Sequence, residues 1–211
     1  MKNNVLIIDC SHGNFIGLIT EQGESFISDL LLKSDLILAS VEQILKENNL
    51  SLDNLSAVAV NIGPGSFTGL RVGVTIAKGL SIVKNIPVIS YTSFEAIIAN
   101  LRRDEKNPVI VLEGFSDYYY IKHKKEECLE KSDIVEILEK TQNSVLCNEK
   151  VAKNLNFAKF QPINTLPFNA VKAKMLDNQF TSVNDLEPVY LRASQAEIER
   201  DKKWKSLQKH D

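Results

Sequence analysis

The sequence has 211 residues, of which 44% are hydrophobic and 25% are charged, a composition typical of a globular chain with one large domain or two small lobes. Its formal net charge of −2 provides no overall positive field that would attract nucleic acid or an anionic membrane. Its three cysteines stand at wide, unpatterned spacing, which argues against a disulfide framework and against a CxxC metal site.

Apolar runs in this sequence are short. The first one, residues 5–8, ends at Asp9, so we expect no signal peptide. No later apolar stretch approaches the ~20 residues that a membrane span needs. We therefore expect a cytoplasmic protein with reduced thiols and no membrane contact.

The first elements in chain order are strands. Residues 5–9 predict a buried strand, and residues 15–19 predict its hairpin partner, because Gly13 and Asn14 between them tolerate positive φ. A third strand is expected at 24–31.

The hydrophobic period then changes from that of a strand to that of a helix. Ile37, Val41 and Ile44 recur at three- and four-residue steps with charged residues between them, which predicts an amphipathic helix over 34–47. The apolar run 57–60 is typical of a strand that is buried on both faces of a sheet.

A long helix is expected at 68–83, directly after the turn 63–66. A strand follows at 88–90, and Thr92 with Glu95 three residues later forms a capping box for a helix over 92–101.

The charged connector 102–108 ends in a proline and suggests a lobe boundary. The second half predicts strands at 109–112, 118–123 and 144–147 and helices at 133–140 and 169–176, and the tyrosine run 118–120 is expected to alternate between the faces of its strand. We therefore divide the chain into a first lobe (1–104), a smaller second lobe (105–195) and a charged tail (196–211).

The segment from Asn61 to Leu80 contains five of the nine glycines. Gly63 and Gly65 permit positive φ in a strand–turn–helix unit, and Ser66 or Thr68 could cap the exposed amides, which form a potential anion site. The segment is not a P-loop, because no Gly-Lys-Ser/Thr stands at the helix start. Asp9, Gly63, Gly65 and Ser66 are accordingly weak candidates for nucleotide contact.

Small residues recur along one side of the predicted helix 68–83. Gly69, Gly73 and Ala77 stand at four-residue spacing, so a second backbone could approach closely there. A glycine inside a helix costs about 1 kcal/mol relative to alanine, which suggests a packing gain. Two alternatives remain open: the stripe packs on the protein's own sheet or first helix, or it packs on another molecule.

Four motifs together resemble the TsaB family, also called YeaZ. They are the run GPGSFTGLR from Gly63 to Arg71, the run AKGL from Ala77 to Leu80, the opening run from Ile7 to Ser11, and the late run PVYLR from Pro188 to Arg192. The resemblance implies an α/β fold of the actin-like, Hsp70-like (ASKHA) two-lobed class with a small second lobe.

The resemblance also implies a function. TsaB proteins are the dimerisation partners of the catalytic subunit TsaD in bacterial tRNA modification, which places a threonylcarbamoyl group on N6 of adenosine 37, and the ATPase TsaE joins the assembly. It implies a non-catalytic scaffold that binds no cofactor alone, with ATP or ADP only in the complex. We also expect only indirect contact with tRNA, and a homodimer when the protein is isolated, because the apolar face that would bind TsaD would then self-associate.

We expect two helices to form the face that docks onto TsaD. The residues expected there are Ile37, Val41 and Ile44 of the first helix and Gly69, Val72, Gly73, Ile76 and Leu80 of the second.

Histidine spacing argues against catalysis by this chain. A TsaD-type metal site needs two histidines one helical turn apart, and the only histidines are His12, His123 and His210. The HExxH motif of zinc proteases is missing as well. The alternative is a small ASKHA-type ATP-dependent kinase or acyl- or phosphotransferase that uses Asp9 and the turn 63–66.

One segment departs from the family pattern. TsaB proteins usually carry an Asp-Ala-Arg-Arg-like segment at the start of the second lobe, where this chain has Leu112 to Tyr120 (LEGFSDYYY). Glu113 and Asp117 keep some acidic character there, but the arginines are missing.

Overall fold

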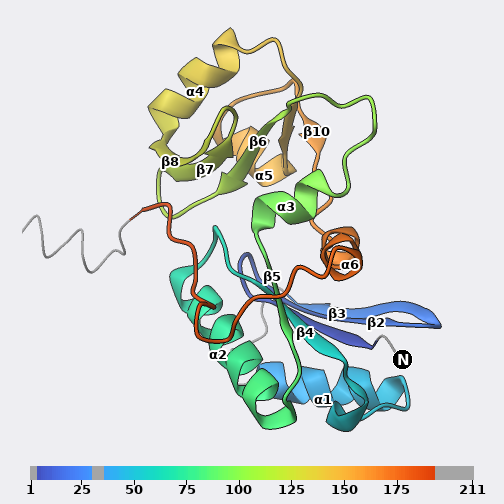
Figure 1. Cartoon of the computed structure of the whole chain (residues 1–211). Coiled ribbons are helices and arrows are strands. Elements are labelled where there is room, and N and C mark those ends of the chain that lie inside the picture. Colours follow the sequence, from blue (N-terminus) through green and yellow to red (C-terminus); the bar gives the residue numbers. More distant parts are fainter. Residues whose placement is uncertain (1–3, 30–35, 193–211) are drawn as a thin grey trace, which may run out of the picture.

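The structure is a computed structural model that describes residues 4–29 and 36–192, and it contains two lobes with one five-stranded sheet each (Figure 1). The strands of the first sheet are β1 (Val5–Asp9), β2 (Asn14–Thr20), β3 (Gly23–Asp29), β4 (Ala57–Asn61) and β5 (Val88–Tyr91). Around it lie α1 (Ile37–Glu47), the 3-10 turn η2 (Leu52–Asn54), α2 (Phe67–Lys84), α3 (Ser93–Ile98) and α6 (Phe168–Leu176).

The second lobe is built in the same way with shorter elements. Its strands are β6 (Val109–Glu113), β7 (Tyr118–Lys122), β8 (Glu126–Glu130), β9 (Val145–Cys147) and β10 (Gln161–Pro162), and its helices are α4 (Lys131–Lys140) and α5 (Glu149–Asn154). The first sheet has the order β3-β2-β1-β4-β5 and the second β8-β7-β6-β9-β10, each an antiparallel meander extended by two parallel strands.

The core of the first lobe lies on both faces of its sheet, because alternate residues of a strand point to opposite faces. Leu6 and Ile8 of β1 pack with α1 and α2 on one face, whereas Val5 and Ile7 pack with α6 and α3 on the other. This two-sided burial explains why the central strands are continuous apolar runs.

Most of the predicted elements are confirmed, and the capping box of Thr92 and Glu95 is present at the start of α3. That helix ends at Ile98, before the predicted end at 101. Tyr119 and Tyr120 are buried in different clusters, as alternating faces require. The prediction omitted β8, α5 and β10, which are short or at the sheet edge.

The predicted tail 196–211 lies outside the described residues. So do the last two residues of the predicted strand 24–31 and the first two residues of the predicted helix 34–47. Within the described ranges, no helix is long and apolar enough to cross a membrane.

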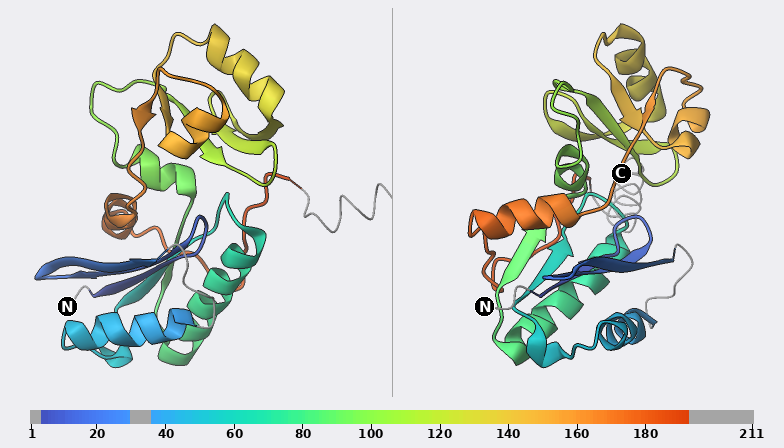
Figure 2. Two further views of the ribbon diagram at one scale, coloured as in Figure 1. Left: turned by 180° about the vertical axis from the view of Figure 1, so that it is seen from behind. Right: turned by 90° about the vertical axis from the view of Figure 1, so that its right-hand side faces the viewer.

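The last part of the described chain returns to the first lobe, which differs from the predicted division at 105–195. Phe168 and Val171 of α6 are buried against the first sheet, and Leu186 is fully buried in the core beneath α1 and α2. The second lobe therefore covers about 105–162, and the views in Figure 2 show α6 and the segment after it beside the first sheet. The sequence could not reveal this return, because α6 has no strongly amphipathic pattern.

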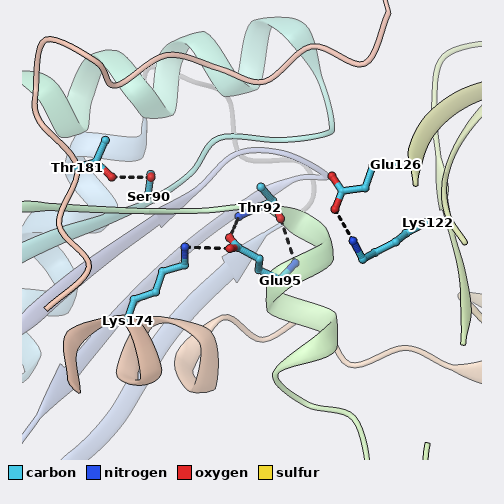
Figure 3. Close-up of polar contacts among 7 residues, drawn as sticks. All are labelled: Ser90, Thr92, Glu95, Lys122, Glu126, Lys174 and Thr181. Atoms are coloured by element: carbon cyan, nitrogen blue, oxygen red, sulfur yellow. Dashed lines mark hydrogen bonds and ion pairs between the residues drawn. The ribbon is translucent and has the colours of Figure 1, made fainter. Parts of the chain in front are cut away.

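Polar contacts fasten the returning segment to the first lobe (Figure 3). The Ser90 hydroxyl of β5 lies 2.7 Å from the Thr181 hydroxyl. The Lys174 ammonium of α6 lies 2.9 Å from Glu95, whose other carboxylate oxygen accepts a hydrogen bond from the Thr92 amide at 2.7 Å. Glu95, which completes the capping box of α3, thus also holds α6 in place.

Candidate functional site

A buried polar cluster lies where β1, β4 and β5 end, beside the glycine-rich turn. Asp9 Oδ1 accepts hydrogen bonds from the Ser11 amide at 2.9 Å and the Ser11 hydroxyl at 2.6 Å. Asp9 Oδ2 accepts from Asn61 Nδ2 at 2.8 Å and from the Tyr91 hydroxyl at 3.1 Å. Four donors from the chain itself therefore surround this carboxylate.

Asn61, the last residue of β4, connects that carboxylate to the turn. Its amide nitrogen lies 3.1 Å from the Ser93 hydroxyl as well as bonding to Asp9, and its amide oxygen accepts from the Gly63 N–H at 2.8 Å. The Ser93 hydroxyl in turn donates to the Pro64 carbonyl at 2.8 Å. These contacts satisfy the buried polar groups and hold the turn in one conformation.

The glycines of the turn allow the chain to approach itself closely. A Cβ at Gly65 would lie 2.5 Å from the Ser11 carbonyl oxygen, and one at Gly69 would lie 2.0 Å from the Cys10 carbonyl oxygen. Gly63 has φ of 116°, a conformation that residues with a side chain rarely adopt. The Ser66 amide donates to the Ser11 carbonyl at 2.7 Å. The turn is thus packed onto the connection between β1 and β2.

The structure brings together all four weak nucleotide candidates. Asp9 is occupied by four donors, and Gly63 and Gly65 serve close packing. Ser66 caps α2, where its hydroxyl accepts from the Gly69 amide at 3.2 Å. A strand-end aspartate whose oxygens all accept from the following residues and neighbouring strands is typical of a side chain that holds a turn. Among the described residues, no group of three or more His, Cys, Asp or Glu side chains could hold a metal ion.

Burial suppresses the acidity of the groups around this cluster. Tyr91 has a pKa well above its ordinary value, because burial and then the Asp9 charge disfavour the phenolate. Burial, assisted by Asp9, raises the pKa of the Cys10 thiol to about 12. Neither group supplies an anion or a nucleophile near neutral pH.

The structure resolves the two alternatives for the stripe of small residues. Gly73 faces this chain's own β1, since a Cβ there would lie 3.5 Å from Cys10 Sγ and 3.7 Å from Ile8 Cγ2. Gly69 contacts the Cys10 backbone, and Ala77 is fully buried. The stripe is internal packing, so we expect Gly73→Leu to disturb this chain's own fold.

The other residues expected at the partner surface also lie mainly inward. The side chains of Ile37, Val41 and Ile44 are at most 3% exposed. Val72, Ile76 and Leu80 are partly buried against the same core. None of the first three can reach a partner in this conformation, because the face of α1 that the sequence marks as apolar covers the chain's own sheet.

The outward sides of the two helices carry a different set of residues, which we call the outer helix face. Its members are Leu38 of α1 and Thr75, Gly79, Ile82 and Val83 of α2. Leu38 is 58% exposed, Ile82 67% and Val83 77%. A Cβ at Gly79 would meet no atom of residues 4–29 or 36–192 within 4 Å. Both helices cover the same side of the first sheet (Figure 1).

Sequence reasoning missed the outer helix face because it assigned the main apolar stripes to a partner. A usable signal was present: Thr75, Gly79 and Ile82 recur at four- and three-residue steps and so lie on one side of α2, away from Gly73 and Ala77.

Parts of the sequence are similar to two groups of known proteins, TsaD-type transferases and TsaB proteins. The family model of TsaD, tRNA N6-adenosine threonylcarbamoyltransferase, matches residues 33–114. The tRNA threonylcarbamoyladenosine biosynthesis protein TsaB of Buchnera aphidicola is 31% identical over 41% of this chain and 41% of that relative. TsaB of Haemophilus influenzae is 43% identical over 29% of this chain and 26% of that relative. The matched stretches thus span less than half of these curated relatives.

Among solved structures, YeaZ from Pseudomonas aeruginosa has a TM-score of 0.71 with 16% sequence identity, and the match covers 90% of this chain and 100% of that one. This likeness shows the fold: the chain is an α/β protein of the actin-like, two-lobed class, as predicted. Within that fold, the chain is similar in sequence to several TsaB proteins over part of their length and similar in fold to YeaZ.

Proposed function

We propose that this chain is a non-catalytic dimerisation subunit that supports a TsaD-type transferase in forming N6-threonylcarbamoyladenosine at position 37 of tRNA. The names of its relatives support this role, since they are biosynthesis proteins or transferases for this modification. The outer helix face supports the scaffold part of the proposal. Because tRNA modification of this kind takes place in the cytoplasm, the proposal includes a cytoplasmic location.

Gly79 is the observation that carries the docking proposal. A glycine inside a helix costs about 1 kcal/mol relative to alanine, and among the described residues no atom lies within 4 Å of a Cβ built on Gly79. Ile82 and Val83 beside it are large, apolar and exposed. An open glycine among exposed apolar side chains suits the close approach of a partner helix.

The kind of partner follows from the sequence match. Residues 33–114, which resemble TsaD, contain both α1 and α2. A TsaD-type partner would therefore present a related pair of helices, and the two pairs would meet in a pseudo-symmetric, four-helix contact. Without that partner, the same face would pair with a second copy of this chain. TsaE would join the complex, and tRNA would be contacted through the other subunits.

The polar cluster argues against the kinase-like alternative. Asp9 is surrounded by four donors, and the turn 63–66 is packed on the chain itself. Accordingly, the isolated chain should bind no nucleotide, and ATP or ADP should bind only in the complex. Calorimetry with ATP and magnesium tests this point, because tight binding to the isolated chain would favour the kinase.

The docking experiment measures binding of the purified chain to a TsaD-type transferase by calorimetry. We expect a Kd in the micromolar range or below, and at least a tenfold weaker Kd for Ile82→Asp and for Gly79→Leu. Leu176→Asp is the matched control, because Leu176 is 83% exposed on α6 at the opposite face of the first sheet. Failure of the chain to bind at micromolar concentration, or equal weakening by the control, would sink the proposal.

A further inference from the structure

The segment from Val183 to Arg192, here called the strap, runs from the first lobe to the second. In Figures 1 and 2 it passes from the α6 side of the first lobe to the beginning of α2 and then toward the second sheet. The strap has no helix or strand of its own. Its contacts therefore determine its path.

Four contacts anchor the strap to the first lobe. Leu186 is fully buried in the core, and Glu187 pairs with Lys78 of α2 at 2.7 Å. The Val189 amide donates to the Ile62 carbonyl at 2.7 Å. The Val189 carbonyl oxygen lies where a Cβ at Gly63 would be only 2.8 Å away. The strap is thus fitted closely over the start of the glycine-rich turn.

Tyr190 continues this contact along α2. Its ring stacks on that of Phe67 with a centroid distance of 4.4 Å and an interplanar angle of 2°. Arg71 Nε donates to the Tyr190 hydroxyl at 3.0 Å. The first turns of α2 therefore hold the strap just before it reaches the second lobe.

The last two residues of the strap contact the second lobe. Leu191 packs against a cluster that joins Phe94 of α3 to Leu112 and Tyr120 of the second sheet. The Arg192 guanidinium lies 5.0 Å from the ring centroid of Tyr118 and 5.6 Å from that of Phe115, which is within the range of cation–π attraction. The strap thus bridges the two lobes.

The strap bridges the lobes on the side of the molecule away from their backbone connections. The other backbone connections between the lobes are 99–108, after α3, and 163–167, before α6. Figures 1 and 2 show α3 and α6 on one side of the molecule and the end of the strap on the opposite side. Near the strap, the Tyr120 hydroxyl of the second lobe donates to the Gly65 carbonyl at 3.3 Å. The two connections are placed as a hinge, and the strap is placed across from them.

We propose that the strap is a latch that fixes the angle between the two lobes. Leu191 and Arg192 fasten its far end, while Leu186 and Val189 keep its near end on the first lobe. When the far end is released, the lobes rotate about 99–108 and 163–167, and the contact between Tyr120 and the turn opens. This proposal does not depend on the proposed function.

The test is amide hydrogen exchange together with small-angle X-ray scattering on the full chain carrying Leu191→Ser and Arg192→Ala. We expect exchange at least tenfold faster in peptides that contain the turn 63–66, with a larger radius of gyration, while the Val189 amide stays protected because the near end of the strap remains bound to Ile62. Exchange in β1 and β2 should not change, because the core of the first lobe stays intact.

Ile163→Ser is the matched control, because Ile163 is another partly buried side chain of the same cluster but belongs to the hinge-side connection. We expect it to leave the radius of gyration and the exchange of the turn unchanged. If the double variant unfolds, Arg192→Ala alone decides, with about threefold faster exchange in the turn expected. Unchanged exchange in that variant, an equal effect of Ile163→Ser, or uniform acceleration across both sheets would overturn the latch.

Discussion

The two lobes have the same strand order but use it differently. In each, an antiparallel meander is followed by a strand, a crossover helix and a parallel neighbour. In the first lobe this crossover begins with a glycine-rich turn and continues into the 18 residues of α2. In the second lobe the crossover helix α5 has only 6 residues and is capped by Asn148, whose side chain accepts from the Val151 amide at 2.8 Å.

This difference separates what the fold needs from what the first lobe adds. A crossover needs a capped helix that returns the chain to the sheet, and α5 satisfies this without a glycine-rich turn. The glycines before and within α2 serve two other purposes. Gly65 and Gly69 let the helix start press on the connection between β1 and β2, and Gly79 leaves an opening on the outer helix face.

Gly69, at the start of α2, is where we expect a substitution to destabilise the protein most. A Cβ at Gly69 would lie 2.0 Å from a backbone oxygen, so Gly69→Ala should lower the free energy of unfolding by about 3 kcal/mol. Gly79→Ala, in open space on the same helix, should instead raise it by about 0.5–1 kcal/mol. Urea unfolding monitored by circular dichroism measures both, and equal effects of the two variants would contradict this account of the glycines.

The next effect compares the residues that end β1 and β6. Asp9→Asn replaces a carboxylate that accepts from four donors by an amide whose NH2 group must face some of them, so we expect a loss of about 2 kcal/mol. Glu113→Gln should cost less than about 0.5 kcal/mol, since it loses only an ion pair with the exposed ammonium of Lys150. Thermal unfolding of both variants measures the two losses of stability. A larger loss for Glu113→Gln than for Asp9→Asn would contradict this prediction.

A smaller effect concerns the caps of the two crossover helices. Asn148→Ala removes an acceptor from the start of α5 and should cost about 1 kcal/mol. Ser66→Ala removes the weaker, 3.2 Å acceptor from α2 and should cost less, because the turn is also held by the Ser66 amide and by its glycines. Denaturant titration of both variants tests this order, and a greater loss for Ser66→Ala would show that the turn depends on its cap.

The smallest effect concerns two buried thiols and appears in mildly alkaline solution. The pKa of Cys10 is raised from 9.0 to about 12, mainly by burial, and that of Cys147 from 9.0 to about 11. A raised pKa means that the unfolded thiol ionises first, so each stabilising contribution is complete below pH 9 and declines as pH rises. At pH 9 the unfolded thiol is half ionised, which costs about 0.4 kcal/mol per group.

Above pH 9 the contribution of Cys147 should stop declining near pH 11, whereas that of Cys10 should decline until about pH 12. Unfolding of Cys10→Ala and Cys147→Ala between pH 8 and pH 10.5, relative to the unchanged protein, measures these contributions. If the free energy of unfolding changes with pH in the same way for a variant and for the unchanged protein, the thiol that the variant lacks has an ordinary pKa in the folded chain.

The elements of the first lobe were largely predictable because their signals are local. The hairpin after β1, the period of α1 and the box of Thr92 and Glu95 are each visible within a few residues. The second lobe was harder, because β10 has two residues and β8 has no buried residue. A strand that lies at an edge and buries little has little need of a distinctive apolar pattern.

The location of the candidate site was predictable from local signals, but the orientation of its residues was not. The glycines of the turn and the helix marked the segment 61–80 as unusual, but spacing along one helix does not tell which stripe meets another part of the chain. The position of Cys10 decides that Gly69 and Gly73 face inward, and the distance from other atoms decides that Gly79 does not.

The local periods, the caps, the motif that resembles TsaB and the lack of a histidine pair for a TsaD-type metal site can all be read from the residues in order. The return of α6 and the strap to the first lobe, the four donors on Asp9 and the outer helix face around Leu38 and Gly79 emerge only when distant segments pack together. The two sets of features differ in the sequence distance over which their interactions act. Periods and caps depend on residues within one or two turns, whereas burial and close approach depend on strands and helices that meet from distant parts of the chain.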